Sequence, residues 1–180
     1  MEDCGFTLFE TALGPCGIAW GAHGLLAVQL PERSADATRA RLVRSVPRAR
    51  PLPLTPAAER ARDGIVALLD GADDDLADVP LELETVPEFH RAVYALAREI
   101  RPGRTTTYGE LAARLGAGPG AARAIGQALG RNPWPIVVPC HRIVAASGGT
   151  GGFSAPGGVD TKLRLLEIER VHGNGTPTLF

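Results

Sequence analysis

Residues 121–144 read AARAIGQALGRNPWPIVVPCHRIV, and this stretch carries most of what the sequence says about the fold. Its first nine residues form a helical pattern in which Ile125 and Leu129 share one face and nearly every other position is Ala or Gly. Three prolines follow, and they flank a short apolar run that ends at Cys140. The stretch predicts a slim helix over 121–129 and then a β-like run that presents a thiol.

A second helix is predicted just before this stretch. Thr107 and Glu110 have the spacing of a capping box, in which the hydroxyl and the carboxylate each accept a hydrogen bond from a free amide at the helix start. This helix ends at Gly116, and a glycine-rich turn leads to the helix over 121–129. The pair predicts a helix-turn-helix, although any helical hairpin would give the same pattern.

The small side chains of the second helix allow it to approach another surface closely. Arg123 projects from this helix, which suits insertion into a minor groove only about 6 Å wide. Tight packing against a neighbouring helix is the alternative explanation of the same small residues.

Cys140 is followed by two residues that could activate it. A cysteine is nucleophilic as the thiolate, and a neighbouring histidine or positive charge lowers the thiol pKa from its usual value of about 8.5. His141 and Arg142 supply both kinds of neighbour. Two alternatives stay open, because Cys140 could be a buried structural cysteine and Arg142 could tie down the loop.

The first half of the chain predicts strands followed by helices. Apolar runs at 6–9, 18–20 and 25–30 alternate with glycine turns, which is typical of an antiparallel meander. Ser34 is placed to cap a helix that runs to about Val46. We therefore expect a sheet followed by at least one helix in this half.

A second helix of this half starts at Thr55 and Pro56, since proline is favoured at the first helical position. Residues 73–75 are all Asp, and we expect a solvated linker there that leads to Pro87. A second domain with a helical pattern begins after this proline.

Charge is distributed unevenly along the chain. Residues 1–87 carry 8 basic and 14 acidic side chains, whereas residues 88–180 carry 11 basic and 6 acidic ones. The formal net charge of -1 therefore hides an acidic half and a basic half. The basic half could approach a polyanion such as nucleic acid.

The composition predicts a globular protein of the cytoplasm. With 180 residues, of which 44% are hydrophobic, the chain can form one sizeable domain or two small ones. No apolar run approaches the roughly 20 residues of a membrane span, so we expect no membrane contact. Cys4, Cys16 and Cys140 lack a Cys-x-x-Cys spacing, and together with His23 they show no recognisable zinc pattern. We expect free thiols, and neither a metal nor a cofactor.

Several motifs resemble, in order and spacing, those of the O6-alkylguanine-DNA alkyltransferase family, also called methylated-DNA-protein-cysteine methyltransferases. The reactive-site signature of that family is matched by Asn132-Pro133 and Pro139-Cys140-His141-Arg142. The resemblance covers about residues 87–170 and takes in further matches at Tyr108-Gly109, Arg123-Ala124-Ile125-Gly126, the glycine-rich segment 148–158, Lys162, Leu165-Leu166 and Glu169.

The resemblance implies direct-reversal DNA repair, in which the alkyl group of O6-alkylguanine, and by extension of O4-alkylthymine, moves irreversibly and stoichiometrically to Cys140. His141, oriented by Glu169, would remove the thiol proton through a water. Asn132 would shape the loop between the helix and the reactive strand, and Tyr108 would donate a proton to the departing guanine. Because the product is a thioether with no activated carbonyl, the protein would be spent after one turnover.

Double-stranded DNA is the implied partner, bound by a monomer mainly through the minor groove, with the alkylated base flipped out of the stack. Arg123 resembles an arginine finger that fills the gap left by that base. The other implied DNA-binding residues are Ala122, Ala124, Gly126, Tyr108 and Arg142. The implied substrate pocket contains Ile143, Phe153 and Ser154.

The fold implied by the resemblance has two domains and a tail. Residues 1–80 would form an RNase H-like α/β domain with an antiparallel sheet. Residues 87–170 would form a mainly helical, winged-helix-like domain that contains the helix-turn-helix, and 171–180 would be a mobile tail. The sequence departs from the family pattern at His90, Tyr94 and Phe153, where glutamine, tryptophan and tyrosine are frequent.

Two other classes of protein fit parts of the pattern. A thiol hydrolase could use Cys140 and His141, but such enzymes normally bring these two residue types from distant segments. A DNA-lesion-binding module, like the alkyltransferase-like relatives, would lack the cysteine. The adjacent pair disfavours the first class, and the presence of Cys140 disfavours the second.

Overall fold

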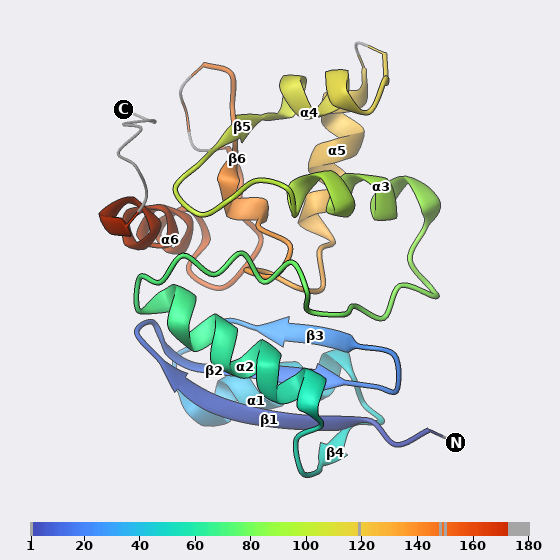
Figure 1. Ribbon diagram of the computed structural model, residues 1–180, viewed down its shortest axis with the longest axis vertical. Coiled ribbons are helices and arrows are strands. Elements are labelled where there is room, and N and C mark those ends of the chain that lie inside the picture. Colours follow the sequence, from blue (N-terminus) through green and yellow to red (C-terminus); the bar gives the residue numbers. More distant parts are fainter. Residues whose placement is uncertain (1, 119, 148, 150, 173–180) are drawn as a thin grey trace.

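The chain folds into a sheet-containing half and a mainly helical half, which stack on each other in Figure 1. The structure is a computed structural model that describes residues 2–118, 120–147, 149 and 151–172, of which 171 and 172 are described by backbone only. The segment for which the sequence predicts a mobile tail, 171–180, therefore lies almost wholly outside the described residues.

The N-terminal half is built on a small mixed sheet. Strands β1 (Gly5–Thr11), β2 (Gly14–Trp20) and β3 (Leu25–Gln29) pair antiparallel in chain order, which confirms the predicted meander. The short strand β4 (Arg50–Pro51) pairs parallel with β1, so the predicted antiparallel sheet is mixed at this edge. The parallel pairing arises because α1 crosses over the sheet between β3 and β4.

Two helices cover opposite faces of this sheet. Helix α1 (Ala35–Ser45) lies behind it in Figure 1 and helix α2 (Pro56–Leu69) lies in front. Both begin where the sequence predicts, because the hydroxyls of Ser34 and Thr55 each accept a hydrogen bond from an amide three residues on. Side chains alternate along the strands, so one face of the sheet packs on α1 and the other contributes to a larger core under α2.

The C-terminal half begins with helix α3 (Glu88–Ala97) and contains the predicted helix pair. Strand β5 (Thr106–Thr107) leads into α4 (Tyr108–Arg114), whose capping box is present as predicted, and α5 (Ala121–Gly130) follows. The half closes with β6 (Ile143–Val144), which pairs parallel with β5, and with α6 (Gly158–His172).

The segment 133–142, which we call the reactive segment, does not form a strand, contrary to the expectation of a β-like run. Pro135 and Val138 form only an isolated bridge, and Cys140–Arg142 form a single turn of 3-10 helix, η1, directly before β6. The prolines explain the difference, because each lacks the amide hydrogen that a strand ladder requires.

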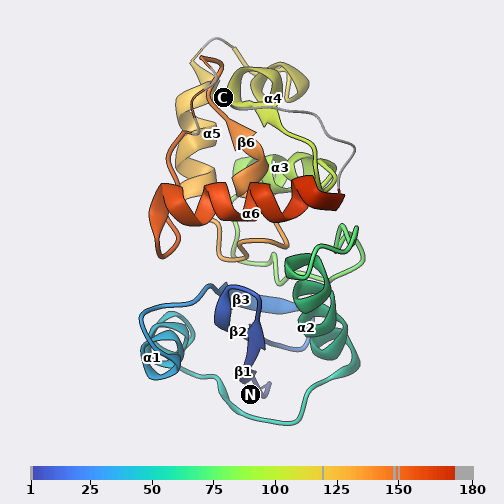
Figure 2. The same cartoon turned by 90° about the vertical axis from the view of Figure 1, so that its left-hand side faces the viewer.

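The two halves share one hydrophobic core. Buried residues of β2, β3 and α2 belong to the same cluster as buried residues of α3, α5 and the reactive segment. Trp134 Nε1 donates to the carbonyl of Leu25 at 2.8 Å, and the amide of Val28 donates to the carbonyl of Pro133 at 2.9 Å. Strand β3 is therefore the edge on which the C-terminal half rests, and Figure 2 shows α6 lying across that half just above the sheet.

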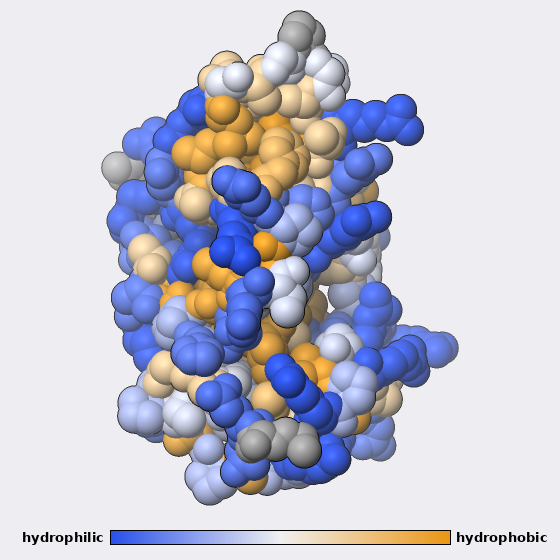
Figure 3. Space-filling view, turned by 90° about the vertical axis from the view of Figure 1, so that its right-hand side faces the viewer, coloured by the Kyte–Doolittle hydropathy of each residue, from blue (hydrophilic) through white to orange (hydrophobic). Residues whose placement is uncertain are grey.

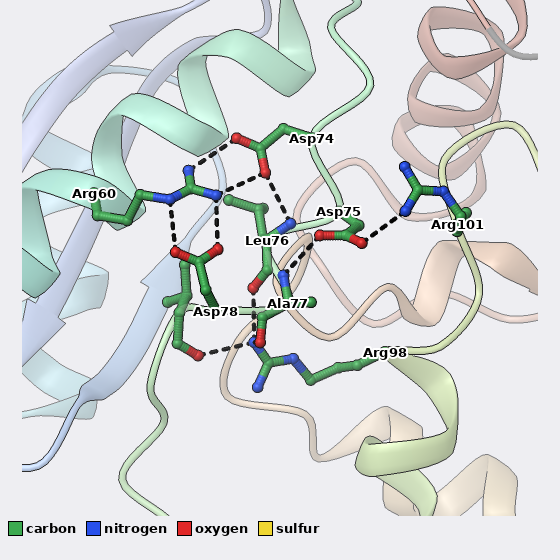
Figure 4. Close-up of polar contacts among 9 residues, drawn as sticks. Arg60, Asp74, Asp75, Leu76, Ala77, Asp78, Arg98 and Arg101 are labelled. Carbon is green, nitrogen blue, oxygen red and sulfur yellow. Dashed lines mark hydrogen bonds and ion pairs between the residues drawn. The ribbon is translucent and has the colours of Figure 1, made fainter.

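The acidic stretch that includes residues 73–75 is an ordered connection, not a solvated linker. Figure 4 shows Arg60 of α2 between two carboxylates of this stretch. Its guanidinium donates to Asp74 at 2.8 and 2.9 Å and to Asp78 at 2.9 and 2.8 Å. The aspartates are neutralised by arginine, which the local sequence could not show.

The same stretch is also bound from the C-terminal half. Arg98, at the end of α3, donates to the carbonyls of Leu76 and Val79 at 2.7 and 2.8 Å, and Arg101 pairs with Asp75 at 2.9 Å (Figure 4). Leu76 has a left-handed backbone (φ 55°) and is fully buried. This connection therefore ties α2, the acidic stretch and α3 together.

On the surface seen from the right-hand side of Figure 1, hydrophilic side chains alternate with smaller hydrophobic patches at mid-height (Figure 3). Figure 3 shows hydrophobic side chains gathered on its upper part, which belongs to the C-terminal half. None of the helices that the structure describes is long and apolar enough to cross a membrane.

Candidate functional site

A pocket of about 930 Å³ opens in the C-terminal half beside Cys140. Helices α4 and α5 form one wall, and the segments 145–146 and 152–154 form another. Cys140 is half-buried and is the first residue of η1. The pocket brings together the predicted site residues Tyr108, Ala122, Arg123, Gly126, Cys140, Phe153 and Ser154.

A buried polar cluster lies directly behind the pocket. Glu169 of α6 accepts hydrogen bonds from His141 Nε2 at 2.7 Å and from Arg142 Nη2 at 2.7 Å. Arg142 Nη1 also donates to the carbonyl of Ile100 at 2.6 Å. All three side chains are nearly inaccessible to solvent, and the charges of Glu169 and Arg142 offset each other.

The carboxylate of Glu169 is ionised in this cluster. Burial alone would raise the pKa of Glu169, but the neighbouring His141 and Arg142 outweigh it and lower the pKa to about 2. For His141, burial lowers the pKa below its usual range despite the carboxylate beside it. The imidazole is therefore neutral near pH 7.

This protonation state assigns the tautomer of His141. A carboxylate can only accept, so the hydrogen of the neutral imidazole must be on Nε2, which faces Glu169. The other nitrogen, Nδ1, then carries a lone pair, and it is buried with no hydrogen-bond partner among the described residues. The cluster thus holds a neutral base with its free acceptor atom inside the protein.

The neighbours His141 and Arg142 do not keep the resting Cys140 thiol ionised, because its pKa is raised and not lowered. Burial raises the pKa of Cys140, and the groups that oppose this are mainly a hydrogen bond from Asn132 and the charge of Lys162. The imidazole of His141 is directed to Glu169. A thiol with a raised pKa is protonated at neutral pH, so it needs a base when it reacts.

Arg142 was predicted as a DNA-binding residue, and its position contradicts this role. The side chain is 1% exposed, and its guanidinium is occupied by Glu169 and by the carbonyl of Ile100. The alternative interpretation, in which Arg142 ties down the loop, agrees with the geometry.

Asn132 holds the turn between α5 and Cys140. Its Oδ1 accepts from the amide of Trp134 at 2.9 Å, and its Nδ2 donates to the carbonyl of Val138 at 2.9 Å. These bonds close the loop that places Cys140, in agreement with the shaping role predicted for Asn132.

The remaining predicted residues divide between the pocket and its surroundings. Tyr108 is half-buried, and its hydroxyl lies so near Gly151 (φ +70°) that a Cβ there would be 3.0 Å away. Burial and the nearby thiol raise the pKa of Tyr108, which keeps it protonated. Ala124 and Ile143, which were predicted at the site, are not among the residues that line the pocket, and the carbonyl of Ile143 accepts a hydrogen bond from Lys162 at 2.7 Å.

Lys162 is a site residue whose role the sequence reasoning missed. It is fully buried in α6, and burial lowers its pKa to about 8 although the nearby Cys140 opposes the shift. A signal existed in the sequence, because Lys162, Leu165, Leu166 and Glu169 fall on one helical face at spacings of three, four and seven. A lysine on the apolar face of a helix predicts a buried charge with a partner.

Cys4, Cys16 and His23, which were considered as zinc ligands, do not form a cluster. His23 lies 3.4 Å from Glu82, and Cys16 contacts the hydroxyl of Thr11. Among the residues that the structure describes, no group of three or more His, Cys, Asp or Glu side chains could hold a metal ion.

The fold and the site together define a mixed α/β protein in which, among the described residues, a pocket-facing thiol is backed by a neutral histidine and an ionised glutamate. This class of site suits group transfer to sulfur. Comparisons with known proteins agree with it.

A model of the "6-O-methylguanine DNA methyltransferase, DNA binding domain" matches residues 88–171. A methylated-DNA–protein-cysteine methyltransferase of Methanothermobacter thermautotrophicus is 36% identical over 159 residues, which are 88% of this chain and 81% of that protein. The protein of the same name from Mycolicibacterium paratuberculosis is 48% identical over 103 residues, and that match covers 57% of this chain and 60% of the relative.

Solved structures of proteins with related names resemble this chain over nearly its whole length. The O6-methylguanine methyltransferase of Mycobacterium tuberculosis superposes with a TM-score of 0.73 at 32% identity, covering 96% of each chain. A structure of Mycobacterium tuberculosis OGT in complex with DNA gives 0.74 at 32% identity, covering 93% of this chain and 94% of that one. The chain belongs to the methylated-DNA–protein-cysteine methyltransferase family, whose members repair DNA by transferring an alkyl group to a cysteine.

Proposed function

We propose that this chain repairs O6-alkylguanine in double-stranded DNA by transferring the alkyl group to Sγ of Cys140. The observation that carries the proposal is the position of this thiol, which faces the pocket between α5 and 152–154 while the His141–Glu169 pair lies behind it. O4-alkylthymine is a second candidate substrate, because its alkyl carbon is bonded to oxygen in the same way.

The proposed reaction moves one alkyl group and one proton. His141 Nδ1 takes the thiol proton through a water, and the charge of Lys162 favours the thiolate that forms. The bond from sulfur to the alkyl carbon forms as the bond from that carbon to O6 breaks. The electron pair stays on guanine, Tyr108 gives it a proton, and solvent returns the proton from His141 to Tyr108. The thioether persists, so each chain reacts once.

We propose that α5 enters the minor groove and that the alkylated base leaves the stack to reach Cys140. The wall of α5 supports this, since Ala122 and Gly126 leave room and Arg123 is exposed beside the pocket opening. The guanine would lie against Phe153 and Ser154, whose hydroxyl donates to the carbonyl of Gly130 at 3.1 Å and so closes that side.

We also propose that the chain is divided into two domains. Residues 1–80 would be an RNase H-like domain, and residues 87–170 would be a winged-helix-like domain with the helix-turn-helix formed by α4 and α5. We propose that the protein acts as a monomer in the cytoplasm, where a reducing environment keeps Cys140 as a thiol.

Incubation with duplex DNA that contains O6-methylguanine, followed by peptide mass spectrometry, tests the proposal. We expect one methyl group per chain, on the peptide that contains Cys140, and no second turnover. The Cys140→Ser variant should acquire none, whereas Cys4→Ser, which changes a buried cysteine distant from the pocket lining, should react like the wild type. Repeated turnover would indicate a thiol hydrolase, and bound but unaltered DNA would indicate a lesion-binding module; either result contradicts the proposal.

A further inference from the structure

A cluster of arginines lies on the N-terminal half, which is acidic as a whole. Residues 33–50 contain six arginines and a single acidic residue, Asp36, whereas the other residues of 1–87 contain two arginines and 13 acidic residues. All six side chains are exposed, on α1 or on the segments that flank it. We call them the α1 basic surface, which consists of Arg33, Arg39, Arg41, Arg44, Arg48 and Arg50.

Most of this charge is not neutralised within the chain. Arg41 pairs with Glu32 at 3.0 Å, Arg39 lies over the ring of Phe6, and Arg50 donates to backbone carbonyls. Among the described residues, Arg33, Arg44 and Arg48 form no ion pair. Their positive charge is therefore available to a partner.

A cleft connects the α1 basic surface with the reactive thiol. Arg41 and Ser45 of α1 line a cavity of about 540 Å³ whose opposite wall contains Arg131 at the end of α5. The same cavity reaches Cys140 and Ser154. Figure 2 shows α1 and α5 on the same side of the molecule, one in each half, and in Figure 1 both lie at the back.

Arg41 and Arg131 line the cleft, and Arg44 lies next to Arg41 on α1. Arg44 follows Arg41 by three residues, so the two side chains are neighbours on the helix surface. Arg131 is exposed on the far wall. Positive charge therefore lies on both walls of the cleft, which suits a ligand that carries negative charge along its length.

We propose that the α1 basic surface binds the phosphate backbone of the same duplex whose alkylated base enters the Cys140 pocket. This inference rests on the proposed function and extends it, since it adds the N-terminal half to the DNA interface. Duplex DNA fits the observations because its phosphates recur along the axis and so can reach both α5 and α1. An anionic membrane fits poorly, because α1 exposes no large hydrophobic side chain beside the arginines.

The test compares the wild type with Arg41→Gln, Arg44→Gln and the double variant in binding to short and long duplexes. The short duplex has about 8 base pairs, or about 27 Å at 3.4 Å per pair, and is chosen to occupy the α5 region alone, whereas the long duplex of about 24 pairs is chosen to reach α1 as well. For the long duplex, we expect the double variant to bind roughly tenfold more weakly at low salt. Its slope of log affinity against log salt should fall by about 0.9 for each phosphate that the variant no longer neutralises. For the short duplex, all variants should bind like the wild type.

Arg62→Gln is the matched control for each single variant, because it removes one positive charge from α2 on the opposite face of the sheet. The affinity of Arg62→Gln for both duplexes should equal that of the wild type. Every variant should react with free O6-benzylguanine at the wild-type rate, which shows that the pocket is intact. An unchanged affinity and salt slope of the double variant on the long duplex would overturn the inference, as would an equal loss in Arg62→Gln or stronger binding to anionic vesicles than to DNA.

The two proposals fail in different ways. If the wild type does not transfer an alkyl group from the short duplex, the proposed function is wrong, and the binding comparison still reports on the α1 basic surface. If transfer occurs and the variants bind long DNA normally, only the α1 basic surface loses its role.

Discussion

Burial has opposite consequences for the thiol of Cys140 and for the histidine beside it. It raises the pKa of Cys140 and lowers the pKa of His141, so that both groups are neutral near pH 7. A neutral thiol is a weak nucleophile, which limits reaction with small oxidants and electrophiles. The neutral imidazole has a free lone pair on Nδ1, as the proposed role of His141 as a base requires.

Tyr94 does not line the pocket, but it contacts the residues on both sides of Asn132. Its hydroxyl donates to the carbonyl of Ala128 in the last turn of α5 at 2.7 Å, and its ring packs edge-on against Trp134. Asn132 lies in the sequence between these two contacts and bonds the amide of Trp134. Tyr94 thereby holds both ends of the segment that positions Asn132.

We predict that Tyr94→Phe weakens this positioning without removing any pocket residue. The absence of the hydrogen bond should lower the free energy of unfolding by about 1 kcal/mol. Reaction of Cys140 with free O6-benzylguanine should slow by roughly fivefold, and the pH profile should move upward because the Asn132 hydrogen bond lowers the thiol pKa. A destabilised variant with an unchanged pH profile would show that Tyr94 serves packing alone.

Among the elements, α5 combines a buried side with an unusually small exposed one. Ile125, Ala128 and Leu129 face the core, while Ala122 and Gly126 line the pocket and leave space beside Arg123. The α4 helix that precedes it starts at a capping box formed by Thr107 and Glu110. The capping box allowed the start of α4 to be predicted, because capping depends on neighbours in the sequence, whereas α5 has no side-chain cap and was predicted from its apolar periodicity after a glycine-rich turn.

Arg123→Ala tests the role of α5 in extruding the base. Without the side chain that fills the stack, the cost of flipping is no longer offset, so we expect repair in duplex DNA to slow about tenfold, equivalent to about 1.4 kcal/mol. Reaction with free O6-benzylguanine needs no flipping and should change less than twofold. Arg114→Ala, which removes an exposed arginine of α4 that does not line the pocket, is the control. Equal losses with both substrates would exclude the finger role.

At the scale of the whole molecule, ionised carboxylates join distant elements. Glu169 of α6 binds Arg142 of η1, which in turn holds the carbonyl of Ile100 after α3. Asp74 and Asp78 bind Arg60 of α2, and hydrogen bonds from this arginine lower the pKa of both carboxyls. The tertiary structure is therefore stabilised by carboxylates that must stay ionised.

Acid should unfold the protein through these groups. The pKa of Glu169 is about 2 in the folded state against an ordinary value of 4.5, so its contribution is complete above about pH 4.5 and is lost as the pH falls through about 2. For Glu169 alone the loss is about 3 kcal/mol. Urea unfolding at a series of pH values should show this fall in the wild type and a flatter dependence in Glu169→Gln. A wild-type stability that does not change between pH 5 and pH 2 would contradict the assignment.

The sequence by itself determined much of the local structure and pointed to the residues that the fold gathers around Cys140. Helix starts at Ser34, Thr55 and Thr107 follow from hydroxyls that cap nearby amides, and the β1–β3 meander follows from apolar runs separated by glycine. The motif around Cys140 predicted a thiol with a histidine partner, and the pairing of His141 with Glu169 is present as expected.

Only the tertiary structure decided how these groups are charged and what they touch. Arg142 is buried, residues 73–75 are part of a connection between the halves, and the charge of Lys162, on α6, acts on the thiol pKa while its Nζ donates to the carbonyl of Ile143. The physical reason is that burial and charge pairing depend on residues that are distant in the sequence. A pattern of neighbours along the chain specifies which bonds an amide can make locally, but it does not specify which side chain the fold will bring to a carboxylate or a thiol.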